Sequence, residues 1–253
     1  MKTTIRTIVY SCCFAVLALA SCKGKAVEGD GNVIAHEIPV DIYSEIRVEG
    51  AFDVIYEAKP DEAAYLRVEA DDNIIPLVDI KTKGRSLNIK ARESINPSRF
   101  VVCTNSPSLK YIESKGASNV TLKGSIAGSE LKIEMKGVGD LNAENLIYEK
   151  SEFKLQGANE LNLAGQCHKA KFELSGTGDI KASGLAVDEL ECNLKGSGNM
   201  EVNALEKLSI EIKGKGEIAY KGNPQITKQK IKGAGSVLSL IHISEPTRQA
   251  EIS

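Results

Sequence analysis

The sequence predicts an all-β fold, a parallel β-solenoid with about twenty residues per turn and a less regular N-terminal half. Two observations predict it. A glycine recurs seven times at intervals of about twenty residues, and apolar residues alternate with polar ones on both sides of each glycine. A β-sandwich or β-meander would place a hairpin turn about every eight to twelve residues. One glycine turn per rung instead favours a coil in which each turn stacks on the one before.

The recurring glycines mark one tight turn in each rung of the predicted coil. Two residues after each glycine comes Gly, Ser or Asn, which tolerate left-handed backbone conformations, and four residues after it comes an apolar residue. This order is typical of a turn that leads into a strand. The seven turn glycines are Gly116, Gly137, Gly157, Gly176, Gly196, Gly214 and Gly233.

Apolar columns on either side of the turns indicate which way each strand faces. Two and four residues before the glycine lie pairs such as Leu155 and Phe153, with a polar residue between them. Cys192 occupies one of these positions, so we expect it to be a small core residue. A third column, nine or ten residues after the glycine, runs through Ile126, Leu146, Cys167, Leu185 and Leu205. Together with the alternation after the turn, this predicts three inward faces per turn and rungs stacked about 4.8 Å apart.

The N-terminal half lacks the regular glycine spacing. Strand patterns such as residues 65–70 occur there, but the turn signals between them are irregular. We interpret residues 33–105 as irregular opening turns and residues 106–237 as seven glycine-marked rungs of one domain, 33–237. A separate β subdomain in the first half is the alternative.

The first residues are typical of an export signal. Lys2 and Arg6 precede an apolar run that is too short to span a bilayer, and the run ends in Leu-Ala-Ser-Cys, which resembles a bacterial lipobox. Residues 1–21 are therefore predicted to be a lipoprotein signal peptide, and Cys22 the lipidated residue. Residues 22–32 are polar and glycine-rich, as expected of a tether between lipid and fold.

The last sixteen residues are predicted not to belong to the native protein. The segment from Leu238 to Arg248 reads LSLIHISEPTR, which resembles the in-frame translation of a transposase sequencing adapter. We therefore interpret residues 238–253 as a sequencing-adapter artefact, with the native residues after Val237 unknown.

Composition excludes several kinds of site. Without the signal and the tail, 29 basic and 32 acidic residues remain, which gives no electrostatic footprint for nucleic acid. Three cysteines then remain, Cys103, Cys167 and Cys192, so no disulfide framework is indicated. No Cys-x-x-Cys pair occurs and histidines are scarce, so we expect neither a zinc site nor a cofactor. We interpret the adjacent Cys167 and His168 as loop neighbours.

One column of polar residues three positions after the turn glycines is a weak candidate for cation binding. Carboxylates stacked about 4.8 Å apart could hold calcium, or could share a proton as a catalytic pair does. A structural role in the turns is the favoured interpretation, because lysines such as Lys136, Lys195, Lys213 and Lys232 come just before the turns and are expected to neutralise the column. The Gly-x-Gly pairs do not form a nucleotide-binding fingerprint. The candidates are Asp140, Glu160, Asp179, Asn199 and Glu217.

Nearly the whole mature chain resembles the auto-transporter adhesin, head GIN domain family, common among lipoproteins of Bacteroidetes. The resemblance is carried by IRVEGAFDVIY at residues 46–56, LNI at 87–89, the Gly-x-Gly-acid-apolar rungs, YKGNP at 220–224 and the closing GAGSV at 233–237. It implies a right-handed β-helix-like fold and an envelope location, and no established activity. Ser118 departs from the pattern in place of the second glycine of the first rung.

The function expected from these observations is that of a non-enzymatic, lipid-anchored protein of the cell envelope, in the outer membrane. An adhesion or binding module for a surface glycan or protein is the first expectation, because a long regular surface suits the display of side chains. Aromatic platforms for sugars are scarce, with no Trp and seven Tyr. A structural or envelope-maintenance lipoprotein is one alternative, and a polysaccharide-active enzyme the other. The ligand, the face of the membrane and the oligomeric state stay open.

Overall fold

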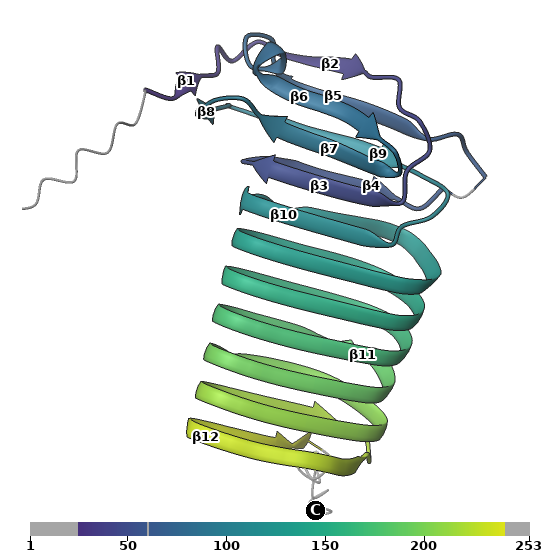
Figure 1. Ribbon diagram of the computed structural model, residues 1–253, viewed down its shortest axis with the longest axis vertical. Helices are drawn as coiled ribbons and strands as arrows, with labels where there is room; N and C mark the ends of the chain where they lie inside the picture. The colour runs from purple at the N-terminus through teal and green to yellow at the C-terminus, as the bar shows by residue number, and fades with distance from the viewer. Residues whose placement is uncertain (1–24, 60, 241–253) are drawn as a thin grey trace, which may run out of the picture.

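The computed structural model describes residues 25–59 and 61–240, which wind into stacked turns of strand below a group of shorter strands (Figure 1). The elements are strands apart from the 3-10 turn η1 (Ile75–Leu77), so the predicted all-β class is confirmed. Cys22, the signal of residues 1–21 and the tail from residue 241 lie outside the described residues.

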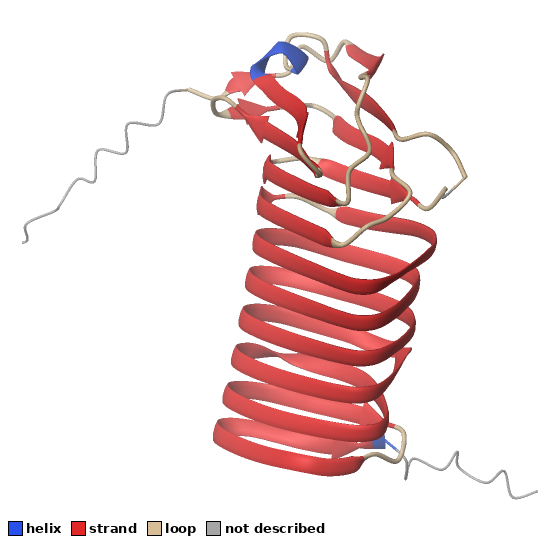
Figure 2. Cartoon of the chain, turned by 45° about the vertical axis from the view of Figure 1, so that its right-hand side comes forward, coloured by secondary structure: helices blue, strands red, loops and turns tan. Residues whose placement is uncertain are grey.

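A single ten-stranded sheet continues from the N-terminal half into the coil (Figure 2). Strands β1 and β8 form a separate parallel pair. The strands are β1 (Val27–Glu28), β2 (Val33–Glu37), β3 (Glu45–Gly50), β4 (Asp53–Glu57), β5 (Tyr65–Asp71), β6 (Val78–Lys83), β7 (Ser86–Ala91), β8 (Ile95–Asn96), β9 (Phe100–Asn105), β10 (Tyr111–Ala117), β11 (Val120–Lys221) and β12 (Gln225–Ser239).

The coil consists of β10, the long winding strand β11 and β12. β10 pairs with β11 in parallel, and so does β12, with Gly116 opposite Gly137 and Gly214 opposite Gly233. Inside β11 the turn glycines approach each other closely. A Cβ atom built on Gly157 would lie 2.0 Å from the carbonyl oxygen of Gly137. The turn glycines thus stack along one edge, where successive backbones leave no room for a side chain. The right-handedness of the coil stays a prediction.

Gly50 adds a rung to this stack that the sequence pattern does not reveal. β3 pairs with β10 and β4 with the start of β11, both in parallel, so that Gly50 lies opposite Gly116. On their other side β3 pairs with β7, and β4 with β9. The rung of residues 45–57 therefore lies between two rungs that follow it in the chain. The repeat is hidden because the strands β5 to β9 intervene in the chain between the two glycines.

Antiparallel strands cover the N-terminal end of the coil. β5 pairs with β9, β2 with β5, and β6 with β7, each antiparallel. The pair β6 and β7 is a hairpin, because Gly84 at φ 61 and Arg85 form a two-residue turn between them. The prediction of opening turns does not include these antiparallel pairs. They belong to the same sheet as the coil.

A buried carboxylate ties this cap to the segment before β9. Asp71 accepts hydrogen bonds from the backbone N–H of Gly31 at 2.9 Å and of Ser98 at 2.8 Å, and from the Ser98 hydroxyl at 2.5 Å. The hydrogen bond from the Ser98 hydroxyl, followed by those from the backbone, lowers the pKa of Asp71. Its charge is therefore stabilised by neutral donors close to it in space.

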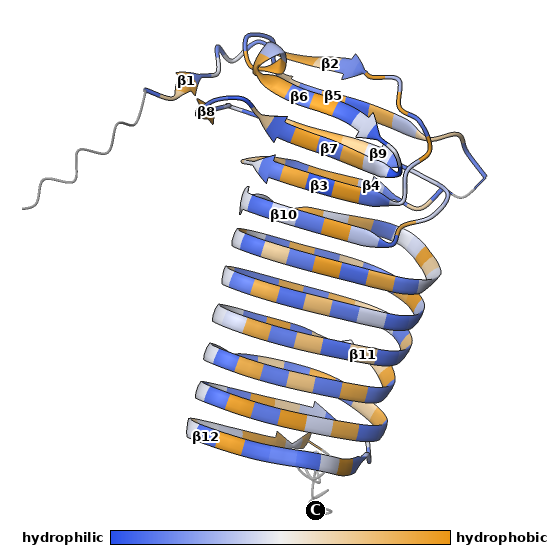
Figure 3. Ribbon diagram, viewed as in Figure 1, coloured by the Kyte–Doolittle hydropathy of each residue, from blue (hydrophilic) through white to orange (hydrophobic). Residues whose placement is uncertain are grey.

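The inside of the coil is apolar. On the side seen in Figure 3, apolar and polar residues alternate along most of the turns. Phe153, Phe172 and Ile210 have no exposed surface, and the rings of Phe153 and Phe172 pack with centroids 5.3 Å apart. Cys192 is fully buried in the same column. Its role as a small core residue therefore agrees with the prediction from its position.

The third predicted column is wrong at one place. Leu205 is 45% exposed, whereas its neighbour Ala204 is fully buried. The spacing from Gly196 to Gly214 is the shortest in the series of turn glycines. In this shortened rung the inward position falls one residue earlier, and the leucine faces outward.

Candidate functional site

The candidate cation column lies along the glycine edge, where its side chains bond to the neighbouring rungs. Asp179 Oδ1 accepts hydrogen bonds from the backbone N–H of Asn199 at 2.9 Å and from its side-chain amide at 3.2 Å. Asn199 Oδ1 in turn accepts from the N–H of Glu217 at 3.2 Å. The backbone N–H of Asp140 donates to the Asn119 side chain at 3.0 Å. These side chains therefore satisfy backbone groups at the corners of the coil.

The expected neutralisation of this column by the preceding lysines is wrong. The Lys136 ammonium lies 2.7 Å from both Glu113 and Glu134, on the flat face before the turn. Glu160 instead pairs at 2.7 Å with Lys181, which follows the turn glycine of the next rung. The reason is that the corner directs the residues before and after it onto different faces. Among the described residues no group of three or more His, Cys, Asp or Glu is arranged to hold a metal ion.

The pair Cys167 and His168 does not form a nucleophile and base. Adjacent residues of a strand face opposite ways, so Cys167 is 5% exposed while His168 points outward. His168 Nδ1 lies 2.9 Å from Asp188 Oδ2, and the Cys167 thiol donates to the carbonyl oxygen of Lys169 at 3.1 Å. Burial raises the pKa of the Cys167 thiol, which disfavours the reactive thiolate.

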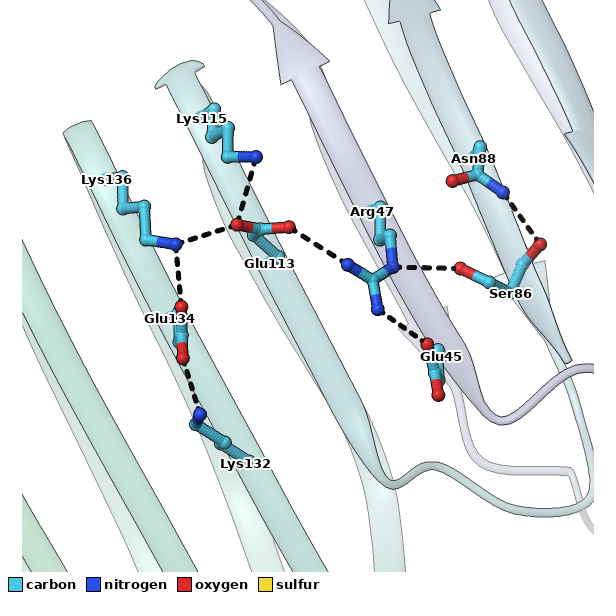
Figure 4. A network of polar contacts seen from close by, with 9 residues as sticks. All are labelled: Glu45, Arg47, Ser86, Asn88, Glu113, Lys115, Lys132, Glu134 and Lys136. Carbon is cyan, nitrogen blue, oxygen red and sulfur yellow. Dashed lines mark hydrogen bonds and ion pairs between the residues drawn. The ribbon is translucent and has the colours of Figure 1, made fainter.

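The flat face before the glycine edge carries a network of ion pairs that crosses several strands (Figure 4). Glu113 accepts from Lys136 at 2.7 Å, Lys115 at 3.0 Å and Arg47 at 3.3 Å. Burial opposes the charge of Glu113, but the lysine hydrogen bonds outweigh it and its pKa is lowered. Hydrogen bonds from Lys132 and Lys136 lower the pKa of Glu134 to about 2.

The same face is hollowed further along the coil into a groove of about 440 Å³, which we call the charged groove. Glu189 is one of its lining residues. It lies 2.8 Å from Lys207 and 2.9 Å from Lys169, and hydrogen bonds from these lysines lower its pKa to about 2. The groove is lined by Lys150, Ser151, Glu152, Lys169, Ala170, Lys171, Glu189, Leu190, Glu191, Lys207, Ser209 and Thr227.

None of the predicted site residues that the structure describes lines the charged groove. The sequence nevertheless contains a signal that could have located this groove. The positions five and seven residues before each turn glycine are occupied by Lys or Glu in most rungs, for example Lys169 and Lys171 before Gly176. With period two, such positions share one outward face of a strand. Stacked rungs bring them together into one charged surface.

Fold and site define an all-β protein whose surface consists of repeated polar columns, and the comparisons identify its family. The family model described as "Putative auto-transporter adhesin, head GIN domain" matches residues 42–224. The chain belongs to this family, which confirms the resemblance seen in the sequence.

Solved structures of similar proteins agree with this. A putative adhesin from Bacteroides fragilis is 25% identical, with a TM-score of 0.81 over 85% of this chain and 100% of that one. A putative lipid binding protein from Parabacteroides distasonis is 27% identical, with a TM-score of 0.73 over the same shares. A putative adhesin from the same organism is 28% identical, with a TM-score of 0.66, again over 85% and 100%.

No curated protein matches the chain. In residues 25–59 and 61–240, no helix has the length and apolar character needed to cross a membrane.

Proposed function

We propose that the protein is a lipid-anchored, non-enzymatic binding module of the bacterial outer membrane, a right-handed β-solenoid that presents its charged groove to a surface glycan or protein. The observation that carries the proposal is the groove itself, a hollow on a rigid sheet with charged side chains of both signs from successive rungs. The adhesin description of the family supports a role in binding.

The anchor and the domain boundaries are part of this proposal. Residues 1–21 act as the signal, Cys22 carries the lipid, 22–32 form the tether, 33–237 the folded domain, and 238–253 are foreign to the native protein. The lipobox-like Leu-Ala-Ser-Cys run supports the anchor. Two or more acyl chains suffice for stable membrane attachment, since each buried methylene contributes about 0.8 kcal/mol.

The ligand we propose is polar and carries groups that bind both ammonium and carboxylate. Lys171 lies 3.4 Å from Glu191, and Lys207 lies 2.8 Å from Glu189, so each charge in the groove is held in place by its partner. Carboxylated sugars and mixed-charge protein surfaces offer matching groups, and few aromatic side chains are present to stack on neutral sugars.

A glycan array tests the proposal. The protein is expressed as residues 23–240, which keeps every described strand, and is compared with its Lys171→Ala and Lys207→Ala variants. Lys181→Ala, on the glycine edge, is the matched control. We expect acidic glycans or a mixed-charge protein ligand to bind the parent and the control, and to bind the groove variants at least tenfold more weakly. Binding that is equal in all four proteins would refute the groove as the ligand site.

A structural role in the envelope is the second candidate, and one observation favours it. The carboxylates of Glu113 and Glu134 form ion pairs with lysines of the protein itself, and both side chains are mostly buried. A face whose charged side chains are paired with one another suits a structural or spacer protein as well as a binding module. A gene deletion that weakens the envelope while Lys171→Ala and Lys207→Ala leave it intact would favour this role.

A further inference from the structure

Residues 27–32, the second half of the proposed tether, lie against the folded domain. Strand β1 pairs in parallel with β8 beside the cap (Figure 1). The backbone N–H of Val27 donates to the carbonyl oxygen of Ser94 at 2.9 Å. The N–H of Gly29 donates to the carbonyl oxygen of Asn96 at 3.0 Å. This part of the chain is therefore fixed to the cap by its backbone.

Two side chains of the cap hold the same segment. Asn73 accepts a hydrogen bond from the backbone N–H of Asp30 at 3.1 Å and donates one to the carbonyl oxygen of Glu28 at 2.8 Å. The buried carboxylate of Asp71 accepts from the N–H of Gly31 at 2.9 Å. Successive residues of the segment are thus each bonded to the cap, and the segment is docked.

The docked position leaves no room for a side chain at one of the two glycines in the segment. A Cβ atom built on Gly29 would lie 2.5 Å from the carboxyl carbon of Asp71, which has no exposed surface. A Cβ atom on Gly31 meets nothing within 4 Å. A larger residue at Gly29 should therefore displace the segment, whereas one at Gly31 should not.

Docking shortens the link between the proposed lipid at Cys22 and the fold. At about 3.4 Å per residue, the chain from Cys22 can reach about 17 Å to Val27, against about 37 Å to Val33. The stack of turn glycines from Gly50 to Gly233 is about 34 Å high, at about 4.8 Å per rung. The longer link would allow the far end of the coil to face the membrane with the cap turned away. The shorter link does not.

The capped end carries a charge that suits an anionic membrane surface. The hairpin of β6 and β7 with its flank, residues 78–92, holds five basic residues and one acidic residue, although acidic residues are in excess over the whole chain. Basic side chains beside a lipid anchor are attracted to anionic headgroups. The five basic residues, all exposed, are Lys81, Lys83, Arg85, Lys90 and Arg92.

Charge alone does not select this end of the coil. Strand β12 at the far end carries Lys228, Lys230 and Lys232. Along the flat face between the two ends, lysines pair with glutamates, as Lys207 does with Glu189 at 2.8 Å. The length of the link is what favours the capped end, because it keeps β1 close to the lipid.

We propose that the capped end of the coil is a membrane-contact surface. The docked segment of residues 27–32 holds this end at the bilayer that contains the acyl chains of Cys22, and the hairpin of β6 and β7 contacts the anionic headgroups there. The inference rests on the lipid anchor proposed above. The charged groove then lies on rungs farther from the membrane, where it is open to a ligand outside the bilayer.

The test uses the full chain, expressed with its signal in a bacterium that acylates lipoproteins. The protein is reconstituted in vesicles of phosphatidylethanolamine with a quarter of phosphatidylglycerol, and flotation checks the anchor. A donor dye at Glu93, in the loop before β8, or at Lys215, near the far end, reports its proximity to acceptor dyes on the headgroups. Hydrogen exchange reports whether residues 27–31 are docked.

We expect energy transfer from position 93 to be at least twofold greater than from position 215, with slow exchange in residues 27–31. Gly29→Asn should abolish the slow exchange and at least halve the transfer from position 93. Gly31→Asn is the matched control, because asparagine tolerates the φ of 78 at this position, and it should keep both.

A second pair of variants tests the headgroup contact. Lys81→Glu with Lys83→Glu should lower the transfer from position 93 and leave the slow exchange unchanged. Vesicles without phosphatidylglycerol should have the same effect on the parent. Lys195→Glu with Lys213→Glu, farther along the flat face, is the charge-matched control and should leave the transfer unchanged.

The outcomes separate this contact from the anchor on which it rests. A parent that does not float with the vesicles would refute the anchor, and the membrane contact with it. A parent that floats but shows equal transfer from both positions would overturn the contact alone, because the coil then lies flat. The contact would also be overturned by a Gly29→Asn protein that loses slow exchange but not transfer, or by equal losses in the two charge variants.

Discussion

The glycine stack makes a sharp prediction about stability. Gly157→Ala introduces a methyl group whose carbon would lie 2.0 Å from the carbonyl oxygen of Gly137 and 2.9 Å from its carbonyl carbon. Since Gly157 also has φ 112, the alanine backbone is strained as well. Conformational strain of about 1–3 kcal/mol and overpacking of about 1–3 kcal/mol give a total loss of about 2–6 kcal/mol.

The control for this substitution is Gly84→Ala. Gly84 also has a positive φ, 61, but a Cβ atom there meets nothing within 4 Å, so only the conformational cost of about 1–2 kcal/mol applies. Thermal melting followed by circular dichroism should lower the midpoint by about 5–20 °C for Gly157→Ala and by clearly less for Gly84→Ala. Hydrogen exchange should locate the loosened rungs at the substitution, because each repeat contacts only its neighbours. A Gly157→Ala protein that melts no lower than Gly84→Ala would refute the close approach of the stacked backbones.

Three further predictions concern the anchor, the ion pairs and the tail. Cys22→Ser should move the protein out of the detergent phase in a partitioning assay; unchanged partitioning would disprove the lipid anchor. The pKa of Glu134 is held at about 2 by Lys132 and Lys136, below its unfolded value, so it stabilises the fold above about pH 4.5 and this contribution is lost as the pH falls towards 2. Urea unfolding between pH 5 and 2 should show a shallower decline in Glu134→Gln than in the parent, and identical slopes would count against the pair. Long-read sequencing of the gene should find no in-frame codons for Ile241 to Ser253, and their presence would show that the tail is native.

The sequence predicts the regular part of the fold well, because there a local pattern and the spatial neighbour coincide. From Gly137 onward, each turn glycine packs against the turn glycine of the preceding rung, which lies about twenty residues earlier in the chain. The regular spacing in the sequence therefore predicts the stack. Phe153 and Phe172 are found inside for the same reason.

The irregular parts escape the sequence because their partners are distant. Gly50 meets Gly116 from far away in the chain, and no periodic signal spans an interval occupied by other strands. The pattern predicts an inward Leu205, whereas the structure buries Ala204, because the shortened rung after Gly196 moves the inward position one residue earlier. Hydrophobicity alone favours the leucine over the alanine at such a position. The sequence does not predict the charged groove, because within any single rung its lysines and glutamates look like ordinary surface residues. The groove forms only where several rungs stack.

The insertion of β3 and β4 between later rungs has a consequence for the order of folding. Rungs of the coil close loops of about 20 residues, whereas the contact between β3 and β10 closes a loop about three times as long, which costs about 1 kcal/mol more in loop entropy. The rung formed by β3 and β4 pairs with β7 and β9 on one side and with β10 and the start of β11 on the other. All of these partners, residues 86–123, are synthesised after it. We therefore expect the coil to form from its middle and the N-terminal rung to dock last. Pulse-labelled hydrogen exchange during refolding would then protect residues 133–212 before residues 46–56, and the opposite order would exclude this route.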